Sequence, residues 1–423
     1  GVIPTTRTGR RPSRCRTLVH APQRLARRLP GQPRRFLQPQ NAGEIISDVK
    51  PSLWHIAGLF LRLGATAFGG PLAHIALMRH EFVLRRGWLS DEKFAELIGL
   101  TNLIPGPNST EMAIHLGHFR AGWRGCLFAG ASFILPAVLL TLVVAWFYAE
   151  YGRLPQIQAL LFGIKPAILA VIVAAVLPLA SVTLNRANSV LAATLAAALC
   201  FAGLNEVLAM LAGGLFAVLA SLGHGTPQAA RLFSTIPPLL PWLDLQDLQL
   251  AGIFLKIGSI LYGSGYVLFA FLDSELVETG FISRAQLIDA VAVGQITPGP
   301  VFSAVTFIGY QVNGFSGAIF STFAIFLPSF VFVLATQRIL PRLKKSALFS
   351  AFLQGVNAAS VAIIAYALIG LGQSAFSQWS TIAIAAISAL GMYFFKTINS
   401  AWIVLFGAVS GYILLECGVL QVK

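Results

Sequence analysis

Charged residues are scarce in this sequence of 423 residues, since only 11% of them are Asp, Glu, Lys or Arg. A soluble globular protein carries roughly 25%. Hydrophobic residues make up 56% of the chain, which gives more apolar runs than the surface of a soluble protein could cover. The composition therefore excludes an ordinary soluble domain and favours a membrane protein.

Cysteine is also rare, and the four cysteines lie far apart, at Cys15, Cys126, Cys200 and Cys417. No C-x-x-C pair and no Cys/His cluster has the spacing of metal ligands, so the sequence predicts no metal and no cofactor. Enzyme motifs are missing too. There is no Walker A sequence, and residues 80–84 begin like a zinc-protease H-E-x-x-H motif but end in leucine. We therefore expect a protein that is not an enzyme.

Long apolar runs are what the sequence has in abundance. Four runs approach the ~20 residues that span a bilayer, at 126–148, 160–179, 315–335 and 349–371. Four shorter runs lie at 190–202, 207–222, 381–395 and 401–415. With the interrupted segments described below, they predict an all-α polytopic membrane protein with about 10–13 membrane segments.

Positive charge is concentrated at the front of the chain. Residues 1–50 hold ten arginines and one lysine against Glu44 and Asp48, so +9 of the net charge of +14 lies there. A basic segment before the first apolar helix predicts a cytoplasmic N-terminus. This Arg/Pro-rich stretch is typical of a disordered tail or of an organelle transit peptide. Because it lacks interleaved aromatic residues, we expect no nucleic-acid binding.

A Pro-Gly-Pro motif occurs twice within apolar surroundings, at Pro105-Gly106-Pro107 and Pro298-Gly299-Pro300. Neither motif can continue a helix, because proline lacks the backbone N–H and glycine is conformationally permissive. In lipid, the freed backbone groups must be buried in protein or line a cavity. A broken or re-entrant helix in each half of a chain points to the binding site of a secondary transporter.

Both motifs belong to an internal repeat that needs only two single-residue gaps. Residues 59–64 align with 253–258, 87–90 with 280–283, and 135–136 with 327–328. We read a first repeat at 51–222, a linker at 223–247 and a second repeat at 248–423, after the tail at 1–50. Basic loop residues fall at different places in the two halves, which predicts that the two homologous repeats are inverted.

Cations within the apolar segments are candidate binding residues, because intramembrane charges are costly. Arg62 and Lys256 occupy equivalent places shortly before a glycine-rich break, where two cations would suit a bound dianion. The alternative is that both extend to the membrane interface. Lys165 is a further intramembrane cation. Gly69 and Gly70, at the first break, would allow close backbone approach to a substrate.

The helix starts after the two motifs carry hydroxyl and amide side chains. Asn108, Ser109 and Thr110 follow the first motif, and Ser303 follows the second. Exposed N–H groups at such a start, together with the helix dipole, form an anion site. The alternative is ordinary capping, with these side chains bonded to the local backbone.

Glu111 and His115 lie four residues apart and so share one face of the following helix. Glu111 has no counterpart in the second half, where Ala304 stands. It is a candidate site for a coupling proton, and His115 could titrate near neutral pH. Alternatively, Glu111 pairs with Arg62 or Lys165. His74 would face the cavity or pack as an ordinary buried histidine.

These stretches resemble the chromate ion transporter family. The signature is carried by residues 68–76, 81–89, 105–111, 120–125 and 135–136, and the resemblance covers about 52–418. It implies the two-domain form of the family, a multi-pass protein that exports chromate across the cell membrane and gives chromate resistance. An organelle membrane is implied instead if the tail is a transit peptide. Sulfate, a dianion of similar shape, is a natural competitor, and a sulfate or other oxyanion permease is the alternative. The expected partners are thus chromate, sulfate and the lipid bilayer, and a homodimer stays open.

Overall fold

The computed structural model describes Gly1 and residues 52–222, 245–263, 265–343, 346–395 and 398–419. The predictions for residues 2–50, and for all but the last three residues of the linker, lie outside this part of the chain. Within it, every regular element is a helix, as the sequence predicts.

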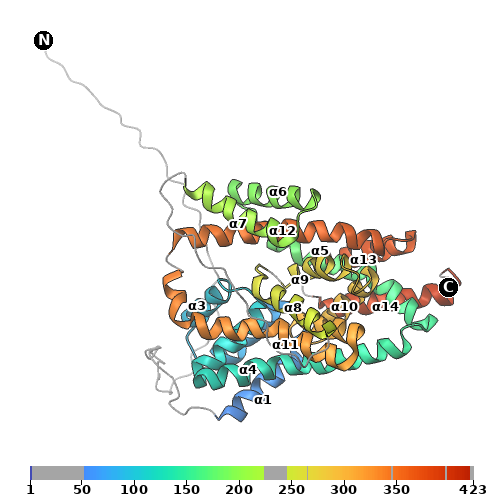
Figure 1. Cartoon of the computed structure of the whole chain (residues 1–423), viewed down its shortest axis with the longest axis horizontal. Helices are drawn as coiled ribbons and strands as arrows, with labels where there is room; N and C mark the ends of the chain where they lie inside the picture. The colour runs from blue at the N-terminus through green and yellow to red at the C-terminus, as the bar shows by residue number, and fades with distance from the viewer. Residues whose placement is uncertain (2–51, 223–244, 264, 344–345, 396–397, 420–423) are drawn as a thin grey trace. The chain divides into compact units, whose positions relative to one another are not determined.

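The helices of the described segments are labelled in Figure 1. Those of the first half are α1 (Leu53–Thr66), α2 (Gly70–Arg79), the π-helix η1 (His80–Arg85), α3 (Asp91–Thr101), α4 (Asn108–Tyr151), α5 (Pro155–Thr183), α6 (Ala187–Phe201) and α7 (Glu206–Leu222). Those of the second half are α8 (Leu245–Ile260), α9 (Val267–Leu272), the π-helix η2 (Asp273–Val277), α10 (Arg284–Ile296), the 3₁₀-helix η3 (Val301–Ser303), α11 (Ala304–Leu343), α12 (Ala347–Ala375), α13 (Trp379–Phe394) and α14 (Ser400–Glu416). Apart from the short η3, which has no separate counterpart in the first half, the two series match element by element, including the π-helix before α3 and before α10.

Four stretches of the described chain are long and apolar enough to cross a membrane: Asn108–Tyr151, Pro155–Thr183, Val301–Ala335 and Ala347–Ala375. The predicted long runs fall within them. The four shorter runs form α6, α7, α13 and α14, which are apolar helices of 15–17 residues. To reach the predicted ten to thirteen membrane segments, helices beside the breaks, such as α1 and α8, would also have to enter the bilayer.

Helices α4 and α11 each contain a tight reversal. Gly122 (φ 60°, ψ −148°) and Gly314 (φ 59°, ψ −145°) adopt a conformation open to glycine and unfavourable for other residues. After each reversal the chain runs back along itself, so that Gly117 abuts the backbone of Gly125. Each element is therefore a short half-helix followed by a long antiparallel arm.

The long arms of α4 and α11 run in opposite directions. Thr141 and Tyr148 on the arm of α4 meet Ser303 and Phe307 in the same order along the chain, at 3.3 Å between hydroxyls and 5.0 Å between ring centroids. The long arm of α4 thus runs parallel to the half-helix of α11. The long arm of α11 folds back on that half-helix, so the two long arms are antiparallel. Opposite directions for equivalent membrane helices are what an inverted repeat requires.

The final helix pair of each half packs on the other half. Helices α13 and α14 lie on α5, and helices α6 and α7 lie on α12. Glycines make these contacts close: Gly163 of α5 abuts the backbone of Gly407 in α14, and Gly355 of α12 abuts that of Gly213 in α7. Small residues let membrane helices approach closely where no hydrophobic effect drives their association. The halves are therefore interlocked by an exchange of helix pairs.

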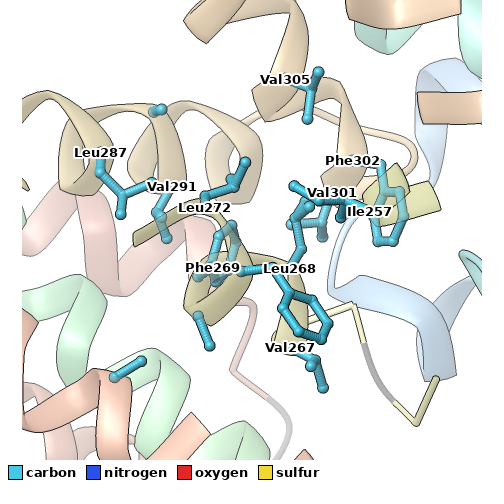
Figure 2. Packing of buried hydrophobic residues seen from close by; sticks show 14 of the residues in the cluster. Ile257, Val267, Leu268, Phe269, Leu272, Leu287, Val291, Val301, Phe302 and Val305 are labelled. Carbon is cyan, nitrogen blue, oxygen red and sulfur yellow. The ribbon is translucent and has the colours of Figure 1, made fainter. Parts of the chain in front are cut away.

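Apolar packing fixes the helices around the second Pro-Gly-Pro motif. Figure 2 shows Val301, just after the motif, beside Leu268 of α9, and Val291 of α10 beside Leu272; all belong to one apolar cluster with Phe302 and Val305. These side chains are buried. The start of the second broken helix is thus fixed by apolar packing against α9 and α10.

Candidate functional site

The two Pro-Gly-Pro motifs are connected to the opposite halves by a reciprocal pair of hydrogen bonds. The N–H of Gly106 donates to the carbonyl of Leu261, just after α8, over 2.8 Å. The N–H of Gly299 donates to the carbonyl of Ala67, just after α1, also over 2.8 Å. Each broken helix therefore satisfies backbone groups freed by the break in the other repeat, as burial in a membrane demands.

The surroundings of the two central glycines differ in polarity. A Cβ added to Gly106 would collide with a carboxylate oxygen of Glu111 and lie 2.7 Å from Ser329 Oγ. A Cβ added to Gly299 would lie 2.9 Å from Ala137 Cβ. Ser329 and Ala137 are equivalent in the two repeats. Where the two repeats cross, at Gly106 and Gly299, the backbone hydrogen bonds are therefore symmetric. The side chains nearest Gly106 are polar, and the one nearest Gly299 is not.

Glu111 is fully buried, on the first turn of α4, beside Gly106 and Ser329. The alternative that it pairs with Lys165 is wrong, because Lys165 lies against Asp289 instead. Within the described part of the chain it forms no ion pair with Arg62 either. His115, one turn further along the same face, is also buried.

The start of α4 has no side-chain cap. The carbonyl of Pro107 accepts from the N–H groups of Thr110 and Glu111, whereas the first N–H groups of a helix have no acceptor within it. Ser109 and Thr110 are buried, and the amide of Asn108 donates to Asn102 Oδ1 over 2.8 Å. In the second half, buried Ser303 accepts a hydrogen bond from Thr141 over 3.3 Å.

His74 belongs to the crossing of the two halves. Its Nε2 lies 3.1 Å from the carbonyl of Ala67, the same group that accepts from Gly299. Because a carbonyl can only accept, this contact requires the Nε2–H tautomer. Gly69 and Gly70 nearby have φ of 102° and 79°, so the turn into α2 depends on glycine.

The two symmetry-related cations have different surroundings. Lys256 Nζ pairs with Glu275 over 2.6 Å and lines an open groove with Gln249 and Phe281. Arg62 is exposed and makes no ion pair with any described residue. The shared role of Arg62 and Lys256 in binding stays a prediction.

Asp289 was not among the candidates from sequence. It is buried on α10, where its Oδ1 lies 3.5 Å from Lys165 Nζ and its Oδ2 accepts from the hydroxyl of Tyr148 over 2.9 Å. The three side chains come from three helices and from both repeats. A sequence signal existed: Asp289 is an acidic residue nine positions before the second motif, in an otherwise largely apolar segment.

An ion pair with exchanged charges occurs at equivalent places in the repeats. Arg79 pairs with Asp91 over 2.8 Å, and the residues aligned with them, Asp273 and Arg284, pair over 2.8 Å with the opposite polarity. Each pair joins the π-helix region to the start of the next helix. Part of the difference in loop charge between the halves is therefore a swap of the acidic and the basic partner, and the ion pair itself is kept at the aligned positions.

Glu81, within the first π-helix, is held ionised by its neighbours. Burial raises the pKa of Glu81, but hydrogen bonds from Arg86 and Arg85 outweigh burial and leave this pKa below its usual value. A depressed carboxyl pKa means that the contact stabilises the fold at neutral pH and is lost as the pH falls through that pKa.

These features define a class of protein: a two-repeat helical membrane protein in which paired discontinuous helices meet where the repeats cross. That is the architecture of secondary transporters.

The chain belongs to the chromate transporter family, whose family model matches residues 54–218 and again 248–412. A probable chromate transport protein of Synechococcus elongatus is 30% identical over 376 residues, which cover 86% of this chain and 95% of the relative. The chromate transport protein of Cupriavidus metallidurans is 30% identical, with coverage of 88% and 96%. That of Pseudomonas aeruginosa is 28% identical, with coverage of 89% and 96%. No solved structure matches.

Proposed function

We propose that this protein is a secondary transporter that exports chromate across the cytoplasmic membrane by alternating access, and so confers chromate resistance. The observation that carries the proposal is the reciprocal bonding of Gly106 to Leu261 and of Gly299 to Ala67. A rocking motion of one repeat against the other would break and remake these bonds together. The names of the relatives supply chromate as the substrate.

The dianion would bind where the half-helices begin. N–H groups at the start of α4 and the hydroxyls of Ser109 and Thr110 would donate to its oxygens, with Ser303 contributing from the other repeat. Arg62, Lys256 and Lys165 would balance its charge. Export of a dianion from a cell that is negative inside is assisted by about 2.3 kcal/mol per charge per 100 mV. No covalent step is needed.

The test is chromate flux in everted membrane vesicles, with sulfate as competitor. Saturable accumulation of chromate, dependent on the membrane potential, is expected. Transport of sulfate without chromate would favour the permease alternative. Flux that does not saturate would indicate a passive channel, and either result would set the proposal aside.

Substitution of Lys256 by Gln is expected to raise the KM for chromate about tenfold or more, the value of a lost charge-assisted hydrogen bond. The matched control is Glu275→Gln, which removes only the partner in the ion pair. If Lys256 binds the anion, Glu275→Gln leaves KM unchanged or lowers it. Equal losses in both variants would show instead that Lys256 acts only through its ion pair.

The Glu111→Gln variant tests proton coupling. A buried carboxylate that takes up the coupling proton would make transport depend on pH, and coupling of this kind is worth about 5–150-fold in affinity. We expect the pH dependence of chromate flux to be reduced in the variant. Unchanged flux with an unchanged pH profile would remove Glu111 from this role.

A further inference from the structure

The buried cluster of Asp289, Lys165 and Tyr148 is formed by α10, α5 and α4. Among the described residues of the helices packed on α10, Lys165 and Tyr148 are the charged or titratable groups that interact with Asp289. Tyr148 donates to one carboxylate oxygen over 2.9 Å. The other oxygen is closest to Lys165, which is itself about one-fifth exposed.

The ion pair in this cluster is long for its surroundings. Its N···O separation is 3.5 Å, against 2.6 Å for Lys256 with Glu275 and 2.8 Å for Arg284 with Asp273. A charge-assisted hydrogen bond is normally about 2.7–2.9 Å long. Asp289 Oδ1 is buried and has no hydrogen-bond partner among the described residues. A buried ion pair repays the cost of its desolvation only where its geometry is excellent, so this long pair is a poor way to stabilise the fold.

The helix that carries Lys165 is weakened at that point. Pro166 follows directly and cannot donate to the carbonyl one turn earlier. The lysine therefore lies at a place where α5 can change its local geometry, while Asp289 is held by Tyr148.

The cluster is close to the proposed anion site. Tyr148 shares one face of α4 with Thr141, which donates to Ser303 at the second half-helix start. Seven residues of helix separate them, about 10 Å along the axis. Lys165 contacts Asp289 beside Tyr148, so to meet an anion bound near Ser303 it would need a change of side-chain conformation together with a local change of α5 or a shift of the anion along this face.

We infer that Asp289 is an internal counter-ion that the transported dianion replaces on Lys165, and that Asp289 takes up a proton when it is displaced. The inference rests on the proposed function. Before binding, Lys165 and Asp289 are a neutral pair. After binding, the ammonium of Lys165 faces the dianion, and a proton from water occupies Asp289 Oδ1, while Tyr148 still donates to Oδ2. No covalent bond other than this O–H is formed.

The linkage has a definite sign. Protonation of Asp289 removes the competitor of the anion, so anion affinity rises as the pH falls, by at most about tenfold per pH unit. The equivalent pair is missing from the other repeat, where Asn357 replaces Lys165 and Glu96 replaces Asp289. Glu96 bonds to Lys93 on its own helix, over 2.8 Å. A single proton per transport cycle is therefore expected from this cluster.

The experiment measures proton uptake by purified full-length protein in weakly buffered detergent solution when sulfate or chromate is added. Sulfate stays a dianion, whereas chromate itself binds protons near neutral pH, so chromate data are taken as differences between variants. Wild type and the matched control Glu96→Gln should take up a proton per bound anion. In a Glu111→Gln background, where Glu111 contributes no proton, Asp289→Asn should take up none and bind the anion with an affinity independent of pH. Asp289→Glu, which keeps the carboxyl group, should retain uptake.

Three outcomes separate the hypotheses. The inference is overturned if the wild-type protein binds an oxyanion without proton uptake at every pH at which it stays folded. This result does not depend on the folding of any variant. Proton uptake that persists when Asp289→Asn is combined with Glu111→Gln overturns it as well. Wild type that neither binds nor transports chromate or sulfate contradicts the proposed function instead.

Discussion

The Gly106→Ala variant is expected to lose chromate transport. Gly106 has φ of 136°, and an added Cβ would strike the Glu111 carboxylate and approach Ser329 Oγ to 2.7 Å. The backbone conformation alone costs a non-glycine residue about 1–3 kcal/mol. Moving this backbone would also break the hydrogen bond to Leu261. The measurement is chromate flux in vesicles, normalised to the amount of folded protein.

A matched control for Gly106 is Gly87→Ala. Gly87 also has a positive φ, of 56°, but an added Cβ there meets nothing within 4 Å. The control therefore carries backbone strain without the collision at the crossing, and it should retain most of the transport. If both variants transport equally well, the crossing of the two repeats does not require glycine at its centre.

Replacement of Gly163 by Leu is expected to prevent assembly of the folded protein. A Cβ at this position would collide with the backbone carbonyl of Gly407 and lie 2.7 Å from the N of Gly411. Neither backbone atom can move without separating α14 from α5. Overpacking of this kind costs typically about 1–3 kcal/mol for added methylenes, and more where the obstacle is backbone. The measurement is the yield of monodisperse protein extracted from membranes.

The packing of α12 against α7 gives a second prediction, which is measured by the same protein yield. Gly355→Leu should be equally damaging, because Gly355 makes the equivalent contact with Gly213. Gly58→Leu and Gly252→Leu are the controls, since an added Cβ at these helical positions meets nothing within 4 Å. A normal yield for Gly163→Leu would contradict the close packing of α5 against α14.

Much of the fold could be predicted from sequence, because in a membrane the apolar runs must themselves be the helices. The eight predicted runs lie in helices to within one residue at their ends, and the glycine and proline positions mark both breaks correctly. The tight reversals at Gly122 and Gly314 could not be predicted in the same way. A glycine within a long apolar run is compatible with a continuous helix, so only tertiary contacts could decide this.

The pairing of charges could be predicted much less well. Lys165 was expected either to bind substrate or to pair with Glu111, and its partner Asp289 comes from the other repeat, 124 positions further along the numbering. Such a contact depends on how two repeats cross, which hydrophobic periodicity does not encode. The exchanged pair of Arg79 with Asp91 could have been found, because opposite charges stand at both aligned positions of the second repeat.

The exchange of helix pairs also constrains how the protein is made. Helix α5 is synthesised early, yet the backbone of α14 that packs against Gly163 is translated more than half a chain later. Until then, the face around Gly163 must be shielded by lipid or by the insertion machinery. Biogenesis of the first repeat is therefore completed after translation of the second. A nascent chain arrested between the two repeats should be a substrate for membrane quality control, even though every helix of its first repeat is already inserted.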